Sequence, residues 1–306
     1  MFSVIFPGQG SQTVGMGKEL FTKYGSVKKL FKEADEILGF PITELILDGP
    51  KEKLDLTENT QPSIFLISFS IFSVIKKEHG INLNNAKYFA GHSLGEYTAL
   101  AASGVLSFSE TLKILKVRGK AMQSAVPKGI GGMLAILGSD VERVEEIIKN
   151  FNCEIANDNS NGQLVISGKI NDLDNLILKL KKLNIKNIKL PVSAPFHCRL
   201  MKKATEVMNL EINKLKFNES QNKLISNVTA KDILKPEEIK KLLVQQIESR
   251  VRWRESVNYM INNGVNQFIE IGPGKVLSGL VKRINKNIKI NAINSEEDIT
   301  TININD

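Results

Sequence analysis

A serine stands between two glycines in segment 91–95, which reads Gly-His-Ser-Leu-Gly. This spacing can present the hydroxyl of Ser93 for attack on an acyl carbonyl, provided that it lies at a sharp turn from a strand into a helix. The apolar stretch 88–90 predicts the end of a strand, and the small apolar residues of 97–102 predict a buried helix. A loop whose serine only caps a helix is the alternative interpretation, but this context favours a nucleophile elbow.

A serine hydroxyl is a weak nucleophile until a base removes its proton, and the chain offers only three histidines for that role. His92 is adjacent to Ser93, and neighbouring side chains on a turn diverge. His79 follows a long apolar stretch and precedes a glycine, which is typical of a structural histidine at a helix C-terminus. By elimination His197 is the predicted base, presented by a loop (191–197) whose two prolines keep it extended after a strand-like run.

A glycine-rich loop, 8–15, follows the first predicted strand at 2–6. Its glycines do not have the spacing of a dinucleotide-binding fingerprint, so the sequence does not indicate a nucleotide site. Acyl chemistry at a serine instead needs two backbone N–H donors for the oxyanion, one from the residue after the nucleophile and one from a neighbouring loop. We therefore predict that the N–H groups of Leu94 and Gln9 form the oxyanion hole.

The composition is that of an ordinary globular protein, with 42% hydrophobic and 24% charged residues among 306. The net charge of +8 comes from scattered lysines without an aromatic-interleaved basic stripe, so we expect no nucleic-acid partner. The two cysteines form no metal-binding motif, and we expect no metal. No apolar run is long enough to span a bilayer, and the first residues lack the basic region of a signal peptide. We expect a cytoplasmic protein that does not bind membranes.

The order of the predicted elements favours an α/β fold in two parts. Residues 131–190 read strand, helix, strand, strand, helix, strand, which is the order of a ferredoxin-like unit. We expect this small domain, 128–192, to be inserted into a large hydrolase-like α/β domain with a mostly parallel sheet. The large domain would comprise 1–127 and 193–306.

This organisation would place Ser93 and His197 in the crevice between the two domains, which is a usual position for a substrate site. Within the small domain, the run of Asn, Asp and Ser at 157–162 predicts a turn between two strands. At the other end of the chain, the segment from Ser295 onward is expected to be a frayed tail.

Five sequence motifs together resemble the malonyl-CoA:acyl-carrier-protein transacylase family, the malonyltransferases of bacterial fatty-acid synthesis. They are Phe-Pro-Gly-Gln-Gly-Ser-Gln at 6–12, Gly-His-Ser-Leu-Gly-Glu-Tyr at 91–97, Arg-Gly-Lys-Ala-Met-Gln at 118–123, Ser-Ala-Pro-Phe-His at 193–197 and Glu-Ile-Gly-Pro-Gly at 270–274. The motifs run from the first predicted strand almost to the C-terminus, so the resemblance covers nearly the whole chain. The family's fold, a hydrolase-like core with a ferredoxin-like insert, agrees with the order of elements described above.

The resemblance implies a ping-pong transfer through a malonyl-serine on Ser93, with His197 as base. Malonyl-CoA would be the donor and the phosphopantetheine thiol of holo acyl carrier protein the acceptor, and no cofactor is implied beyond the coenzyme A thioester itself. Arg118 matches the family's malonate-binding arginine, and a planar guanidinium suits a carboxylate. An exposed charge on a helix is the alternative for Arg118. His92 and Gln246 are further substrate-binding candidates.

A serine hydrolase normally orients its histidine with an acid, yet no Asp or Glu between Ser93 and His197 is persuasive in that role. The resemblance implies main-chain carbonyl acceptors near a glutamine, which corresponds to Gln246. The chain departs from the family here, because Ser-Arg at 249–250 stands where Asn-Pro-like residues are expected.

Two alternative functions stay open: a serine esterase or thioesterase with water as acceptor, and a non-catalytic module that binds acyl carrier protein. We expect a monomer. Candidates for docking an acidic carrier protein are the basic residues Lys202, Lys203, Arg250, Arg252 and Arg254.

Overall fold

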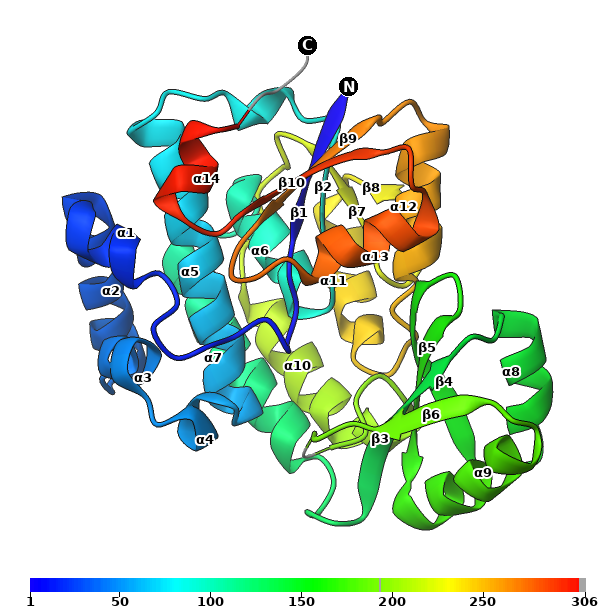
Figure 1. The fold of residues 1–306 in the computed structure, drawn as a ribbon. Coiled ribbons are helices and arrows are strands. Elements are labelled where there is room, and N and C mark those ends of the chain that lie inside the picture. The colour runs from blue at the N-terminus through cyan, green and yellow to red at the C-terminus, as the bar shows by residue number, and fades with distance from the viewer. Residues whose placement is uncertain (193, 303–306) are drawn as a thin grey trace.

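The computed structural model describes residues 1–192 and 194–302 (Figure 1). Ser193, which opens the predicted Ser-Ala-Pro-Phe-His motif, and residues 303–306 lie outside the described residues. The described residues form two sheets, sheet A with six strands and sheet B with four. In the described part of the chain, no helix is both long and apolar enough to cross a membrane.

Sheet A is mostly parallel, as predicted for the large α/β part. Its strands, in spatial order, are β10 (Lys289–Ile293), β9 (Gln267–Ile271), β1 (Phe2–Phe6), β2 (Tyr88–Gly91), β7 (Lys223–Ile225) and β8 (Asp232–Ile233). Only the β7–β8 pair is antiparallel. All five residues of β1 are buried, which is expected of a strand covered by helices on both faces.

Alternate residues of β1 show which helices cover each face of sheet A. Val4 and Phe6 belong to the same apolar cluster as α5 (Thr57–Lys77) and α7 (Phe108–Ser124). Ile5 points to the opposite face, and further helices complete both layers (Figure 1). On the α5 side they are α6 (Leu94–Ala102), α10 (Lys202–Lys214) and α11 (Pro236–Gln246), and on the Ile5 side α12 (Trp253–Asn262) and α13 (Val276–Ile284).

The remaining N-terminal helices pack outside α5 and α7. They are α1 (Lys18–Lys23), α2 (Gly25–Leu38), α3 (Ile42–Asp48) and α4 (Lys51–Leu54), drawn in blue in Figure 1. Two short 3₁₀ helices, Leu83–Asn85 and Arg199–Met201, lead into β2 and α10.

Sheet B forms the separate lobe drawn in green in Figure 1. Its elements follow the chain as β3 (Gly131–Leu137), α8 (Val141–Ile148), β4 (Cys153–Ser160), β5 (Gln163–Lys169), α9 (Ile170–Lys182) and β6 (Lys186–Lys189). The strands are antiparallel in the order β4-β5-β3-β6, which confirms the predicted ferredoxin-like sequence of elements. The boundaries of the two domains, after residues 127 and 192, stay a prediction.

The predicted turn over 157–162 is wrong. Strand β4 continues through Ser160, and only Asn161 and Gly162 form the turn into β5. Turn-favouring side chains here have tertiary partners that compensate for their low strand propensity. Asn159 binds a histidine of sheet A's elbow, and Asp158 pairs with an arginine of α12.

The predicted frayed tail is wrong for residues 295–302, because helix α14 (Glu296–Thr300) follows β10, while residues 303–306 lie outside the described residues. Ser295 and Asp298 form a reciprocal capping box at its start. Glu296 then accepts hydrogen bonds from the Tyr24 hydroxyl at 2.7 Å and from Lys23 at 2.6 Å. The sequence signal for this helix was the Ser-x-x-Asp spacing directly after the last strand.

Candidate active site

Ser93 lies at the turn from β2 into α6, and its backbone has φ 54° and ψ −107°. A positive φ at a residue with a Cβ is a strained conformation that the surrounding structure must enforce. The two flanking glycines allow this, because a Cβ on Gly91 would lie 2.0 Å from the Gly95 carbonyl, and one on Gly95 would lie 2.2 Å from the Phe6 oxygen. The predicted elbow geometry is therefore present.

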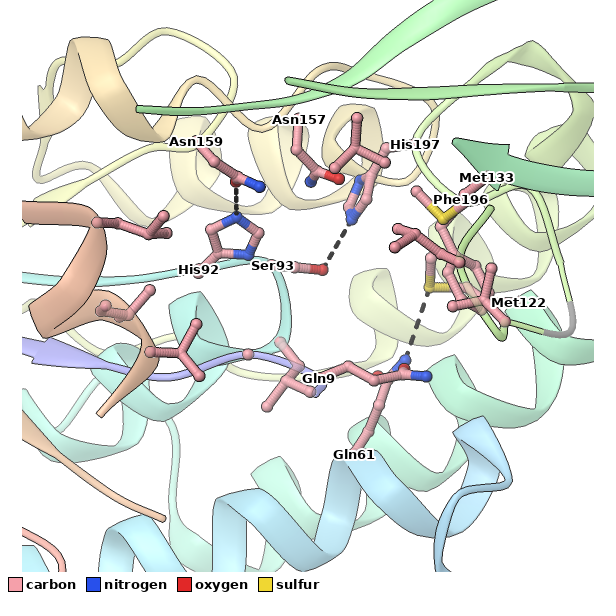
Figure 2. Close-up of a pocket in the computed structure, with 18 of the residues that line it drawn as sticks. Gln9, Gln61, His92, Ser93, Met122, Met133, Asn157, Asn159, Phe196 and His197 are labelled. Carbon is pink, nitrogen blue, oxygen red and sulfur yellow. Dashed lines mark hydrogen bonds between the residues drawn. The ribbon is translucent and has the colours of Figure 1, made fainter. Parts of the chain in front are cut away.

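The Ser93 hydroxyl lies 2.8 Å from Nε2 of His197 (Figure 2). Nδ1 of His197 lies 2.8 Å from the backbone oxygen of Gln246. A carbonyl can only accept, so Nδ1 carries the proton and Nε2 offers its lone pair to the serine. Burial and the nearby Arg118 charge lower the pKa of His197 to about 3, so this imidazole is neutral at neutral pH.

The other two histidines do not contact the Ser93 hydroxyl. Nε2 of His92 lies 2.8 Å from Oδ1 of Asn159, and its ring packs beside Trp253. His79 lies 3.0 Å from the Tyr24 hydroxyl, close to α14.

Arg118 comes from the middle of α7 and is 1% exposed. The alternative of an exposed helix charge is therefore wrong. Its Nη1 donates to Oε1 of Gln61 at 2.8 Å, while Nη2 donates to the Ser93 hydroxyl at 3.0 Å and to Oε1 of Gln246 at 2.7 Å. The buried Nε atom has no hydrogen-bond partner among the described residues. A guanidinium thus lies against the predicted nucleophile, with three of its five N–H groups donating to described residues.

These groups open into one cavity between sheet A and sheet B (Figure 2). Its lining includes the apolar side chains of Met122, Met133 and Phe196 and the polar side chains of His92, Asn157 and Asn159. No Asp or Glu lines it within the described residues. Nor do those residues contain any cluster of three or more His, Cys, Asp or Glu that could hold a metal ion.

Gln9 and Leu94 both line this cavity. Their backbone N–H groups donate to no other protein group in the part of the chain that the structure describes. The side chain of Gln9 is held separately, 3.4 Å from the Thr57 hydroxyl. Two free amides beside the serine are the arrangement that an oxyanion hole requires.

Asn227, which was not predicted from the sequence, holds the backbone of the elbow through two side-chain hydrogen bonds. Its Oδ1 accepts from the Ser93 N–H at 2.7 Å, and its Nδ2 donates to the Gly91 oxygen at 2.8 Å. The Asn227 N–H donates in turn to Glu96 at 3.1 Å. The local signal was an asparagine two residues after the short strand β7, which runs parallel to β2 and ends at the same edge of the sheet.

The predicted docking residues divide into two groups. Lys202 and Lys203 are exposed. The three arginines are each engaged in ion pairs: Arg250 with Glu145, Arg252 with Glu255, and Arg254 with Asp158. Arg254 contacts both carboxylate oxygens of the fully buried Asp158, at 2.9 and 2.8 Å, so we assign it to joining α12 to β4.

Removing one member of the Asp158–Arg254 pair should destabilise the protein. Asp158→Asn should lower the free energy of unfolding by about 3 kcal/mol, because removing one member of a buried pair leaves the other charge uncompensated. Denaturant unfolding of the variant measures this loss. Glu255→Gln, which breaks a half-exposed pair on the same helix, is the control and should cost no more than ~1 kcal/mol. Equal losses in the two variants would contradict the assignment.

Comparison with known proteins agrees with this fold. A family model described as an acyl transferase domain matches residues 3–301, so the chain belongs to the acyl transferase family. It is 43% identical over 302 residues to the malonyl CoA-acyl carrier protein transacylase of Bacillus subtilis (strain 168), which covers 96% of this chain and 94% of that protein.

Two solved structures are similar over almost their whole length. The acyl-carrier-protein-S-malonyltransferase from Bartonella henselae has a TM-score of 0.95 at 41% identity, covering 98% of this chain and 97% of that chain. A malonyl-transacylase in complex with its type II PKS acyl-carrier protein has a TM-score of 0.93 at 37% identity, covering 98% of both chains.

Proposed function

We propose that this chain transfers the malonyl group of malonyl-CoA to the phosphopantetheine thiol of holo acyl carrier protein, supplying fatty-acid synthesis. The buried guanidinium of Arg118, 3.0 Å from the Ser93 hydroxyl, carries this proposal. A malonyl thioester has a carboxylate one methylene group from its reactive carbonyl. A donor whose carbonyl lies at Ser93 can therefore place its carboxylate on Arg118, where a charge-assisted, two-pronged contact is favourable.

In the first half-reaction, the Ser93 oxygen attacks the thioester carbonyl while Nε2 of His197 takes the hydroxyl proton. The negative charge moves to the carbonyl oxygen, and we assign its stabilisation to the N–H groups of Gln9 and Leu94. Collapse of this tetrahedral intermediate breaks the C–S bond. His197 returns the proton to the departing coenzyme A thiolate, which leaves a malonyl ester on Ser93.

In the second half-reaction, the carrier's thiol gives its proton to His197 and attacks the malonyl ester. The C–O bond to Ser93 breaks, and His197 protonates the serine oxygen. Through its backbone oxygen, Gln246 holds the histidine in the tautomer that both steps need. A main-chain carbonyl thus takes the place of a triad acid.

His92 is held by Asn159 at the cavity wall, and we propose that it contacts the donor there. The reaction as written needs no cofactor beyond the coenzyme A thioester, and this stays a prediction. A monomeric state and a cytoplasmic location also stay predictions.

The mass of the intact protein tests the proposal. We expect mixing with malonyl-CoA to add one malonyl group, and later addition of holo acyl carrier protein to move that group to the carrier thiol. An adduct that is lost only to water would indicate an esterase or thioesterase. Absence of an adduct would indicate a module that binds the carrier without the chemistry. Either outcome would overturn the proposal.

A further inference from the structure

Glu96 is a buried carboxyl group for which the mechanism above has no role. It lies in the first turn of α6, three residues after the nucleophile, and is 3% exposed. Its Oε2 accepts from Nε2 of Gln246 at 2.7 Å and from the Asn227 N–H at 3.1 Å. Burying a carboxyl group is unfavourable unless its environment compensates, so its position next to the site requires an explanation.

The side chain of Gln246 links Glu96 to Arg118. Its Oε1 accepts from Nη2 of Arg118 at 2.7 Å, and its Nε2 donates to Glu96. The acceptor end of this amide therefore faces the cation, and the donor end faces the carboxylate. Cation and carboxylate are separated by one amide group.

The three described hydrogen-bond partners of Arg118 are all neutral oxygens, on Gln61, Ser93 and Gln246. Among the residues that the structure describes, no carboxylate forms a direct ion pair with it. Burial lowers the pKa of Arg118, and the charges of Tyr97 and Glu96 act against this. Glu96 is thus the carboxyl group whose charge balances the buried guanidinium.

We propose that Glu96 is the resident counter-charge of Arg118 and that it sets how tightly a carboxylate-bearing donor binds. This inference rests on the proposed function. A carboxylate directly on Arg118 would have to be displaced by each donor. With no counter-charge, the donor's carboxylate would be the first negative group to pair with the guanidinium and would bind too tightly. Tight binding of the substrate that is not specific to the transition state does not raise the rate of turnover. Because the Gln246 amide lies between Glu96 and Arg118, Glu96 balances the charge of the guanidinium without occupying the position that the donor's carboxylate would take.

The titration of Glu96 supports this role. Burial raises the pKa of Glu96 to about 7, against the hydrogen bonds of Gln246 and Asn227 and the charge of Arg118. Burial raises the pKa of Tyr97 to about 12, while burial lowers the pKa values of His92 and His197. Of the titratable groups around the guanidinium, Glu96 is therefore the one that changes charge near neutral pH.

The substitution Glu96→Gln tests the inference, because glutamine can keep both hydrogen bonds through its carbonyl oxygen and removes only the charge. The background is Ser93→Ala, which stops turnover, and calorimetry at pH 8 gives Kd. At an effective dielectric of ~20 we expect malonyl-CoA to bind about tenfold more tightly and acetyl-CoA to change less than ~2-fold. A purely structural role would weaken both ligands.

A control variant and a measurement of pH dependence complete the test. Glu58→Gln removes a half-buried carboxyl group of α5 that pairs with Lys116, and should leave both Kd values unchanged. With Glu96 intact, lowering the pH from 8 to 6 should strengthen malonyl-CoA binding relative to acetyl-CoA, because Glu96 becomes protonated. Acetyl-CoA carries the same coenzyme A phosphates and corrects for their titration. This second measurement does not depend on the Glu96 variant folding.

Unchanged or weaker malonyl-CoA binding in Glu96→Gln, or a malonyl-to-acetyl ratio independent of pH, would overturn the inference alone. If the Ser93→Ala protein with Glu96 intact shows no preference for malonyl-CoA over acetyl-CoA, the proposed function fails instead. The two failures are therefore distinguishable.

Discussion

Replacing Ser93 with alanine should abolish the malonyl adduct and slow malonyl transfer at least ~10³-fold, because nucleophile and base act as a unit. Without the hydroxyl, His197 has no proton to accept and no covalent intermediate can form. Intact-protein mass and the rate of malonyl loading onto holo acyl carrier protein measure the two effects.

Folding of the Ser93→Ala variant is expected to be preserved, because the elbow is held by the Ser93 backbone N–H through Asn227 and not by the hydroxyl. Ser103→Ala is a matched control on the turn that ends the same helix, where the hydroxyl donates to the Leu100 oxygen at 3.1 Å. It should keep near-normal transfer. A malonyl adduct on the Ser93→Ala protein would show that the nucleophile is elsewhere.

The sequence was sufficient to predict that Ser93 and His197 lie together, because both carry local signals. Two glycines around Ser93, with a predicted strand before them and a predicted helix after them, indicate the elbow. Because the chain has only three histidines, few candidates for a base exist. The structure brings these two side chains, which are 104 positions apart, to 2.8 Å. Local signals also predicted the ferredoxin-like order of elements, because its strands and helices keep clear hydrophobic periods.

The surroundings of the pair could not be predicted in the same way. Asn227, Asn159 and Glu96 act through partners that are distant in the sequence, and nothing in their own neighbourhoods specifies those partners. For the asparagine-rich stretch 157–162, turn propensity alone led to a wrong prediction. Its residues favour turns locally, yet contacts with the elbow and α12 hold most of them in a buried strand.

The absent triad acid has a related explanation. Glu96 is the nearest acid after Ser93, and no feature of its sequence neighbourhood favours it as the partner of His197. In the structure it does not touch His197, whose Nδ1 is satisfied by the Gln246 backbone. Gln246 uses its backbone oxygen for the base and its side chain for Arg118 and Glu96. One residue therefore contacts both the proposed base and the proposed carboxylate-binding group.

The substitution Arg118→Ala should remove the preference for malonyl over acetyl donors. Charge-assisted hydrogen bonds contribute about 1.5–3 kcal/mol each, so losing a two-pronged contact should lower kcat/KM for malonyl-CoA by about 10²–10⁴-fold. Acetyl-CoA has no carboxylate to lose, and its kcat/KM should fall much less. The measured quantity is the ratio of the two kcat/KM values, because Arg118 also donates to the Ser93 hydroxyl and its loss affects both donors.

The substitution Arg118→Lys separates charge from geometry. Lysine keeps the positive charge but not the planar fork, so an intermediate malonyl-to-acetyl ratio is expected. Folding should survive in Arg118→Ala, because the pKa of Glu96 is already raised to about 7 and this carboxyl group can become neutral when its cation is removed. A malonyl-to-acetyl ratio that is unchanged in both variants would show that Arg118 does not bind the donor's carboxylate.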